Sequence, residues 1–169
     1  DCDGKSFLNM LSGEDQVLHG SLYGAFTNCN IIGSRDRIYP IRVIRNKSFT
    51  LIFNPKFDTI TTNVTLDRAL AMLEDSTLAG KDIASSWVEL SRLDPDLKPM
   101  VNKLHHRPEY ELYHLENDPY ELRNEISNPD YQAVAEELKN LLHAKLAELG
   151  DSDPVRTEQS LIDDKWIKK

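Results

Sequence analysis

The sequence predicts an α+β fold in which an antiparallel sheet of about four strands has one face covered by a long helix. The strongest indication is the stretch 107–151, where an alternating segment and an acidic turn precede a long amphipathic run. A second indication is a pair of short apolar segments, 39–46 and 48–54, whose close spacing favours a hairpin. A third is a helical pattern over 65–93, which we expect to form an insertion before the last strand.

The first strand is expected near residues 16–27, after a loop and a short helix around 7–11 that Gly13 closes. Apolar and polar residues interleave in this stretch, as in a half-buried strand. Gly20 and Gly24 interrupt the pattern, and glycine inside a strand often marks a bulge or a close backbone approach.

The hairpin is expected to turn at Asn46-Lys47, between strands 39–46 and 48–54. Ile41 and Val43 should share one face and meet Leu51 and Phe53 across the ladder.

Two helices are expected in the insertion, starting at Thr65 and at Ala79. The second should end near Leu93, because the Asp94-Pro95 and Lys98-Pro99 pairs interrupt a helix. Its apolar residues predict one stripe, made of Ile83, Trp87, Leu90 and Leu93.

The last strand is predicted at 109–115, where side chains alternate with a period of two. The main helix is predicted at 129–149 from the capping residues at its two ends. Asn128 is the expected N-cap, Pro129 suits the first helical position, and Gly150 suits the position just after the helix. The predicted apolar stripe contains Tyr131, Val134, Ala135, Leu138, Leu141, Leu142, Leu146 and Leu149.

Composition bounds the class of protein. The chain has 169 residues, 40% of them hydrophobic and 28% charged, which is ordinary for a globular domain. A net charge of −8 argues against a nucleic-acid partner and means that an anionic ligand needs a locally basic pocket. No apolar run approaches the roughly 20 residues that span a bilayer, so no membrane partner is expected. Cys2 and Cys29 are expected to be free thiols, although a bridge between them remains open.

Three blocks of residues resemble a known family. The run Arg-Pro-x-Tyr-Glu-Leu-Tyr-x-Leu-x-x-Asp-Pro-x-Glu-x-x-Asn at 107–124 resembles the C-terminal end of type I sulfatases. The block 39–54, which begins Tyr-Pro-Ile-Arg, is similar to a strand pair of the branch typified by N-sulfoglucosamine sulfohydrolase (heparan N-sulfatase). The opening Asp-Gly-Lys-Ser-Phe-Leu at 3–8 is similar to a segment near the end of the large sulfatase domain. The resemblance implies that 1–27 end the large domain, 28–151 form the C-terminal subdomain and 152–169 are a polar tail.

The same resemblance locates the chemistry outside this chain. Sulfatases of this type use a formylglycine made from Cys or Ser in a Cys/Ser-x-Pro-Ser/Ala-Arg motif, and no residue here begins one. Nothing in the chain matches the family's calcium ligands in context. We therefore expect no catalytic or metal-binding residue here. Calcium and formylglycine are expected in a missing N-terminal sulfatase domain, and the isolated chain should not hydrolyse sulfate esters or sulfamates. The resemblance implies a periplasmic, secreted or lysosome-like parent.

Two polar loops are the candidate substrate contacts. Asn28, Asn30, Arg35 and Arg37 combine amides with guanidinium groups that suit planar anions, and the resemblance places this loop near the rim of the active-site cleft. The other loop carries His105 and His106 between Lys103 and Arg107. The implied ligand is a sulfated glycan or another sulfated small molecule, and a structural loop or an interdomain contact is the alternative for both loops.

Arg42 and Arg45 are expected to form salt bridges with carboxylates of the 107–151 unit. Two other functions stay open at this stage. The parent could be a related phosphate or phosphonate monoester hydrolase, or the chain could be a stand-alone interaction domain. Without its large-domain partner the chain should expose apolar surface and could self-associate.

Overall fold

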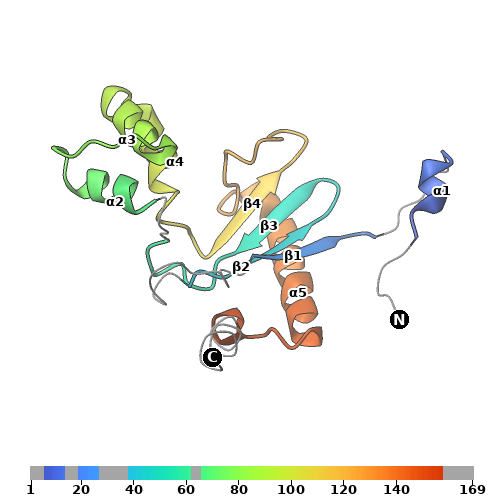
Figure 1. Cartoon of the computed structure of the whole chain (residues 1–169). Helices are drawn as coiled ribbons and strands as arrows, with labels where there is room; N and C mark the ends of the chain where they lie inside the picture. Colours follow the sequence, from blue (N-terminus) through green and yellow to red (C-terminus); the bar gives the residue numbers. More distant parts are fainter. Residues whose placement is uncertain (1–5, 14–18, 27–37, 62–65, 158–169) are drawn as a thin grey trace.

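The computed structural model describes residues 6–13, 19–26, 38–61 and 66–157, and within them it has the predicted α+β architecture. Four strands form one antiparallel sheet in the order β1-β2-β3-β4, and helix α5 (Gln132–Glu148) covers one face of it (Figure 1). A short helix, α1 (Leu8–Leu11), precedes the sheet. The strands are β1 (Leu22–Phe26), β2 (Ile41–Arg45), β3 (Phe49–Phe53) and β4 (Tyr110–His114).

The main core lies between the sheet and α5. Three fully buried residues, one from each of the strands β2, β3 and β4, meet the helix: Ile44, Leu51 and Leu112. The helix contributes Ala135, Leu138, Leu142 and Leu146.

The stripe of α5 is narrower than predicted, because Leu141 and Leu149 are exposed. Successive residues of an α-helix are about 100° apart around its axis. Leu141 therefore points about 100° away from its buried neighbour Leu142 and leaves the apolar stripe. The helix boundaries match the prediction: the side chain of Asn128 accepts from the amide of Asp130, and Gly150 has a φ of +72°.

The hairpin register is one residue away from the prediction. Ile44 lies opposite Leu51 and Val43 lies opposite Ile52, so Ile41 and Val43 do not meet Leu51 and Phe53. The physical reason is the turn, in which the side chain of Asn46 accepts hydrogen bonds from the amides of Ser48 and Phe49. A one-residue change of register moves side chains to the opposite face. Val43 therefore lies on the face away from α5.

A helical insertion connects β3 to β4. It contains α2 (Asp67–Glu74), α3 (Ile83–Leu93), a 3₁₀ turn (Pro95–Leu97) and α4 (Lys98–Asn102). Its small core consists of Ala69, Met72, Ala84, Val88 and Val101.

The predicted apolar stripe of α3 turns outward instead of toward this core. Ile83 is 76% exposed and Leu93 is 84% exposed, and Trp87 and Leu90 are exposed as well. The insertion packs through the opposite, small-residue face of α3, where a Cβ added to Gly80 would come within 2.1 Å of the Ser85 hydroxyl. A face with small side chains allows a close approach, so the bulky residues remain outside.

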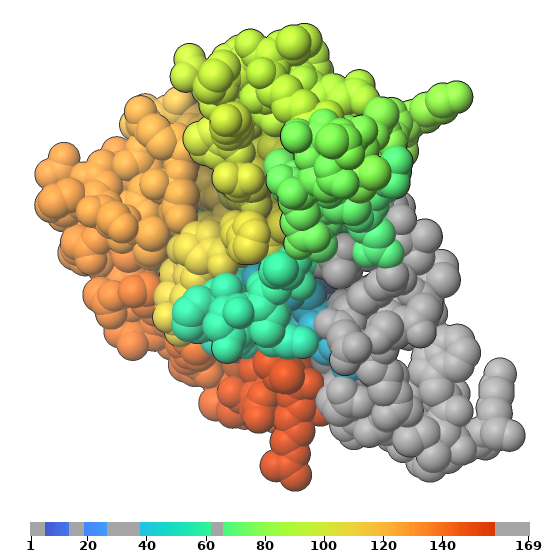
Figure 2. Space-filling model, turned by 90° about the vertical axis from the view of Figure 1, so that its left-hand side faces the viewer, coloured from blue at the N-terminus to red at the C-terminus, as the bar shows by residue number. Residues whose placement is uncertain are grey.

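The two connections between the insertion and the sheet, residues 54–61 and 103–109, lie side by side and are called the neck below. The amide of Thr61 donates to the carbonyl of His105 (2.8 Å), and the His105 ring contacts the Thr61 carbonyl. Asn54 bonds through its amide to Glu109 and through its side chain to Pro108. Figure 2 shows these stretches, turquoise and yellow, beneath the green insertion.

Both predicted arginine salt bridges are confirmed. The Nε of buried Arg42 lies 2.5 Å from Oδ2 of Asp151, just after α5. Arg45 reaches Glu121 at 2.6 Å. Both carboxylates belong to the 107–151 unit, so these pairs fix the loop after β4 and the end of α5 to β2.

Candidate functional site

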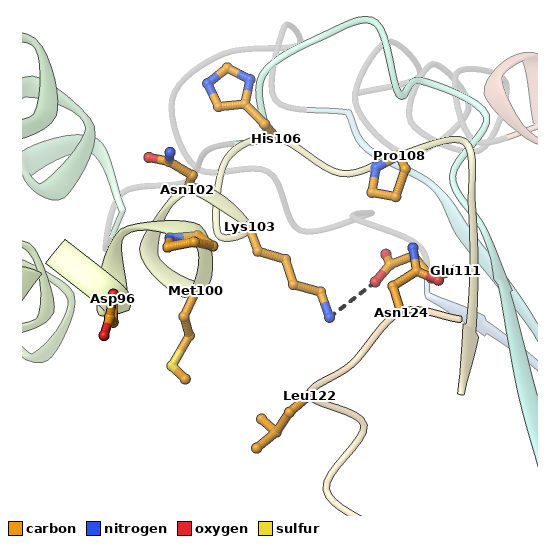
Figure 3. A pocket seen from close by; sticks show the side chains of 10 residues that line it. Asp96, Met100, Asn102, Lys103, His106, Pro108, Glu111, Leu122 and Asn124 are labelled. Atoms are coloured by element: carbon orange, nitrogen blue, oxygen red, sulfur yellow. Dashed lines mark ion pairs between the residues drawn. The ribbon is translucent and has the colours of Figure 1, made fainter. Parts of the chain in front are cut away.

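A pocket of about 410 Å³ opens next to the neck. It lies between α4, the segment leading into β4 and the loop that follows β4 (Figure 3). Ten residues line it: Asp96, Pro99, Met100, Asn102, Lys103, His106, Pro108, Glu111, Leu122 and Asn124.

Glu111 is fully buried at the base of this region. Alternation along β4 directs Leu112 toward α5 and therefore turns Glu111 and Tyr113 to the opposite face. There the carboxylate accepts from the Asn54 amide group at 2.9 Å and from the Tyr113 hydroxyl. It also forms ion pairs with Lys103 (3.2 Å) and Arg107 (3.3 Å).

These contacts keep Glu111 ionised. Burial acts to raise its pKa, but the hydrogen bonds from Tyr113 and Asn54 and the nearby positive charges outweigh it, so the pKa is lowered. Burial and the neighbouring carboxylate raise the pKa of Tyr113. The phenol therefore stays protonated and donates to Glu111.

Lys103 links the buried cluster to the open pocket. Its ammonium donates to the Tyr113 hydroxyl and lies 4.6 Å from the centre of the Tyr113 ring. One third of its side chain is exposed (33%), whereas Glu111 is inaccessible. Figure 3 shows the lysine side chain extending along the pocket toward Glu111. A fixed cation thus forms part of the pocket wall.

The neck also carries buried polar atoms that have no hydrogen-bond partner in the structure as far as it is described. They include Oδ1 of Asn54, Nε2 of His105 and Nε of Arg107. Buried polar atoms are normally paired, so unpaired ones mark positions where water or a ligand group can bind. Their grouping at the neck distinguishes this end of the sheet from the rest of the described fold.

The two predicted histidines differ in exposure. His105 is fully buried, with its Nδ1 3.0 Å from the Thr61 carbonyl. His106 is exposed and lines the pocket. Asn28, Asn30, Arg35 and Arg37 lie outside the described residues, so their substrate contacts stay a prediction.

Sequence reasoning did not select Glu111, Tyr113 and Asn124 as site residues, because they occur inside an ordinary strand pattern or a turn. The available signal was a carboxylate at an inward position of an apolar strand. A buried charge requires partners, and Lys103 and Arg107 stand close by in the sequence.

The described residues contain no group of three or more His, Cys, Asp or Glu side chains that could hold a metal ion. Among the helices described, none combines the length and the apolar character needed to cross a membrane.

Two curated sulfatases are similar to this chain, although no family model matches it. An ulvan-active sulfatase of Formosa agariphila is 34% identical over 152 residues, which make up 89% of this chain and 26% of the relative. The chain is related to sulfatases. A second ulvan-active sulfatase of the same organism is 40% identical over 60 residues, or 36% of this chain and 10% of the relative.

The sulfatase relationship agrees with the fold. The four-stranded antiparallel sheet with a long helix on one face is consistent with the α+β subdomain that the resemblance implied. The chain spans about a quarter of the length of the first relative, 26%. The heparan N-sulfatase branch, the C-terminal position and the boundaries at residues 27 and 151 stay predictions.

Proposed function

We propose that this chain is the C-terminal part of a sulfatase that hydrolyses sulfate esters or sulfamates on a glycan, and that it shapes the rim of the active-site pocket without carrying out the reaction. One observation carries the proposal. A sulfatase is 34% identical to 89% of the chain, while the chain corresponds to only 26% of that enzyme.

The division of labour follows from the residues. No Cys or Ser of this chain begins the formylglycine motif. The nucleophile and its calcium ion therefore belong, in this proposal, to an N-terminal domain of the parent. What this chain offers is a pocket with a fixed ammonium group, which suits binding and orientation of an anionic substrate.

Exposed apolar side chains on β1 support an N-terminal domain as the partner. Leu22 is 60% exposed and Phe26 is 57% exposed. Both lie on edge strand β1, opposite Arg45 and Ile41, and on the sheet face away from α5. Exposed apolar groups at a sheet edge are typical of a surface that another domain covers. A chain without that domain would use the same surface for self-association.

The substrate is proposed at the level of a class. Both relatives are named for activity on ulvan, which makes ulvan the first substrate to test. The second substrate to test is N-sulfoglucosamine, because residues 39–54 resemble the N-sulfoglucosamine sulfohydrolase branch. A periplasmic, secreted or lysosome-like location of the parent is part of the same proposal.

Parallel assays of the parent protein and of the 169-residue chain test the proposal. With an aryl sulfate and calcium, the parent should release sulfate and the isolated chain should not. The matched control is the parent with its motif Cys or Ser replaced by Ala, which should be inactive. Turnover by the chain above a heat-treated sample contradicts the non-catalytic role. A parent that cleaves aryl phosphates or phosphonates but no sulfate contradicts the sulfatase assignment.

A further inference from the structure

The pocket at the neck has the size and the walls of a small-ligand site. Its volume of about 410 Å³ lies within the usual range for bound small molecules, roughly 300–1,000 Å³. Much of its wall is carbon, contributed by Pro99, Met100, Pro108 and Leu122. Such walls contact the C–H groups of a ring and leave polar edges to define its orientation.

The polar edge is positively charged on one side. Lys103 and Arg107 both pair with one buried carboxylate, Glu111, so these three groups together carry one surplus positive charge; the carboxylate of Asp118 also interacts with Lys103. An ammonium has three N–H donors, and Glu111 and Tyr113 occupy two of those of Lys103. The third donor remains for a group in the pocket. His106 also lines the pocket, but Figure 3 shows its ring far from the Lys103 ammonium.

The other side of the pocket is acidic or neutral. Asp96 and Asn102 line it, and Figure 3 shows Asp96 far from the ammonium of Lys103. A carboxylate repels a second anion but accepts hydrogen bonds from hydroxyl groups. The pocket is therefore polarised, with an anion-binding end at Lys103 and a hydroxyl-binding end at Asp96.

The anion-binding end is held in place before any ligand arrives. Glu111, fixed by Asn54 and Tyr113, anchors Lys103. On the adjoining wall, the side-chain oxygen of Asn124 accepts from the backbone amides of Leu112 and Ile126. A preorganised cation loses little conformational entropy on binding, which improves affinity.

We infer that this pocket binds one acidic sugar unit. The carboxylate or sulfate group of the sugar lies against Lys103, its ring contacts Met100, Pro108 and Leu122, and its hydroxyls face Asp96. The inference rests on the proposed function only in taking a glycan as the ligand. The same charge pattern would accept either acidic group, so the experiment separates the two.

Nuclear magnetic resonance on the ¹⁵N-labelled 169-residue chain tests the inference with four probes: glucuronate, glucose 6-sulfate, glucose and inorganic sulfate. At least one acidic sugar should shift the amide signals of residues 100–108 and 122–124, with an affinity about tenfold higher than that of glucose, equivalent to one charge-assisted hydrogen bond. A preference between the two acidic sugars identifies the substituent. Equal shifts with glucose, or shifts with inorganic sulfate alone, overturn the inference.

Variants separate the charge of Lys103 from its structural role. Lys103→Gln should weaken binding of the acidic sugar about tenfold. Lys81→Gln removes one positive charge from an exposed position outside the pocket and should leave binding unchanged. Unchanged affinity in Lys103→Gln contradicts the inference.

Lys103→Gln also leaves Glu111 short of a partner and could unfold the chain. The double variant Lys103→Gln/Glu111→Gln removes both charges of that pair. It should keep the thermal transition of the Glu111→Gln variant and still lose the acidic-sugar preference. A folded double variant that retains the preference overturns the inference.

Binding and catalysis remain distinguishable, because these titrations need no turnover. A chain that binds acidic sugars beside a parent that hydrolyses no sulfate refutes the proposed function and supports the pocket. A parent with sulfatase activity, together with a chain that binds no acidic sugar, supports the proposed function and refutes the acidic-sugar pocket.

Discussion

The sheet with α5 and the helical insertion are two packed units that bury very different side chains. Between the sheet and α5 the core is made of large aliphatic residues such as Ile44, Leu112 and Leu142. In the insertion it is made largely of small ones such as Ala69, Ala84 and Val88. The insertion leaves its bulky residues Ile83 and Leu93 exposed. Since apolar burial scales with area, most of the stability of the described fold should reside in the sheet unit.

The largest expected effect lies where the two units meet. Lys103 and Arg107 both form an ion pair with Glu111, and Glu111→Ala removes that shared carboxylate. Losing one partner of a buried ion pair costs about 3–5 kcal/mol. Urea titration should show this loss of unfolding free energy. Glu109→Ala, an exposed neighbour, should change it by less than about 0.5 kcal/mol. A mild effect of Glu111→Ala would mean that the neck does not hold the units together.

The next effect tests the sheet unit itself. Leu142→Ala leaves a cavity against the sheet and should cost about 2–5 kcal/mol. Leu93→Ala in α3 removes the same atoms from an exposed position and should cost less than about 0.5 kcal/mol. Thermal or urea unfolding of the two variants gives the comparison directly. Similar losses in both would show that something covers the exposed face of α3.

A smaller effect is expected in the core of the insertion. Val88→Ala removes two buried carbon atoms and should cost about 1.5 kcal/mol. If the insertion opens independently of the sheet, hydrogen exchange should quicken in α2–α4 and stay unchanged in β2–β4. Faster exchange in both units would mean that they unfold as one.

The charge of Glu111 should also give the sheet unit a distinct pH dependence. Its pKa lies below the ordinary 4.5, so the stabilisation is fully present above that pH and is lost as the pH falls through the lowered value. Below about pH 4.5 the difference in unfolding free energy between the wild type and Glu111→Gln should therefore shrink. A difference that is constant down to pH 2 would show that folding does not lower the pKa of Glu111.

The smallest effect concerns the end of α5. Gly150 has a φ of +72°, and an added Cβ would contact nothing within 4 Å. Gly150→Ala should cost about 1 kcal/mol through backbone strain alone. Gly20→Ala, where φ is not positive, is the matched control and should be close to neutral. Equal thermal transitions of the two variants would exclude a strained helix end.

The sequence predicts the elements well where a local rule decides them. Asn128 and Gly150 locate α5 because capping depends on neighbouring residues alone. The predicted register of the hairpin was wrong, because it depends on the Asn46 side chain. The outward direction of the α3 stripe was not predicted, because it depends on the close approach near Gly80. The pocket could not be predicted, since it requires β4, α4 and the loop after β4 to meet in space. Of its residues only His106 was a candidate beforehand.

The paired ends of the insertion have a consequence for how such chains diversify. Thr61 and His105 are hydrogen-bonded to each other, so the segment between them leaves the sheet and returns at one point. Helices can be added, exchanged or deleted between these two residues without altering the strand ladder. Because His106 and Lys103 flank the return point, every such exchange would also reshape the pocket wall. Exchanging the segment between Thr61 and His105 would then change which ligands the pocket binds, while the sheet stays the same.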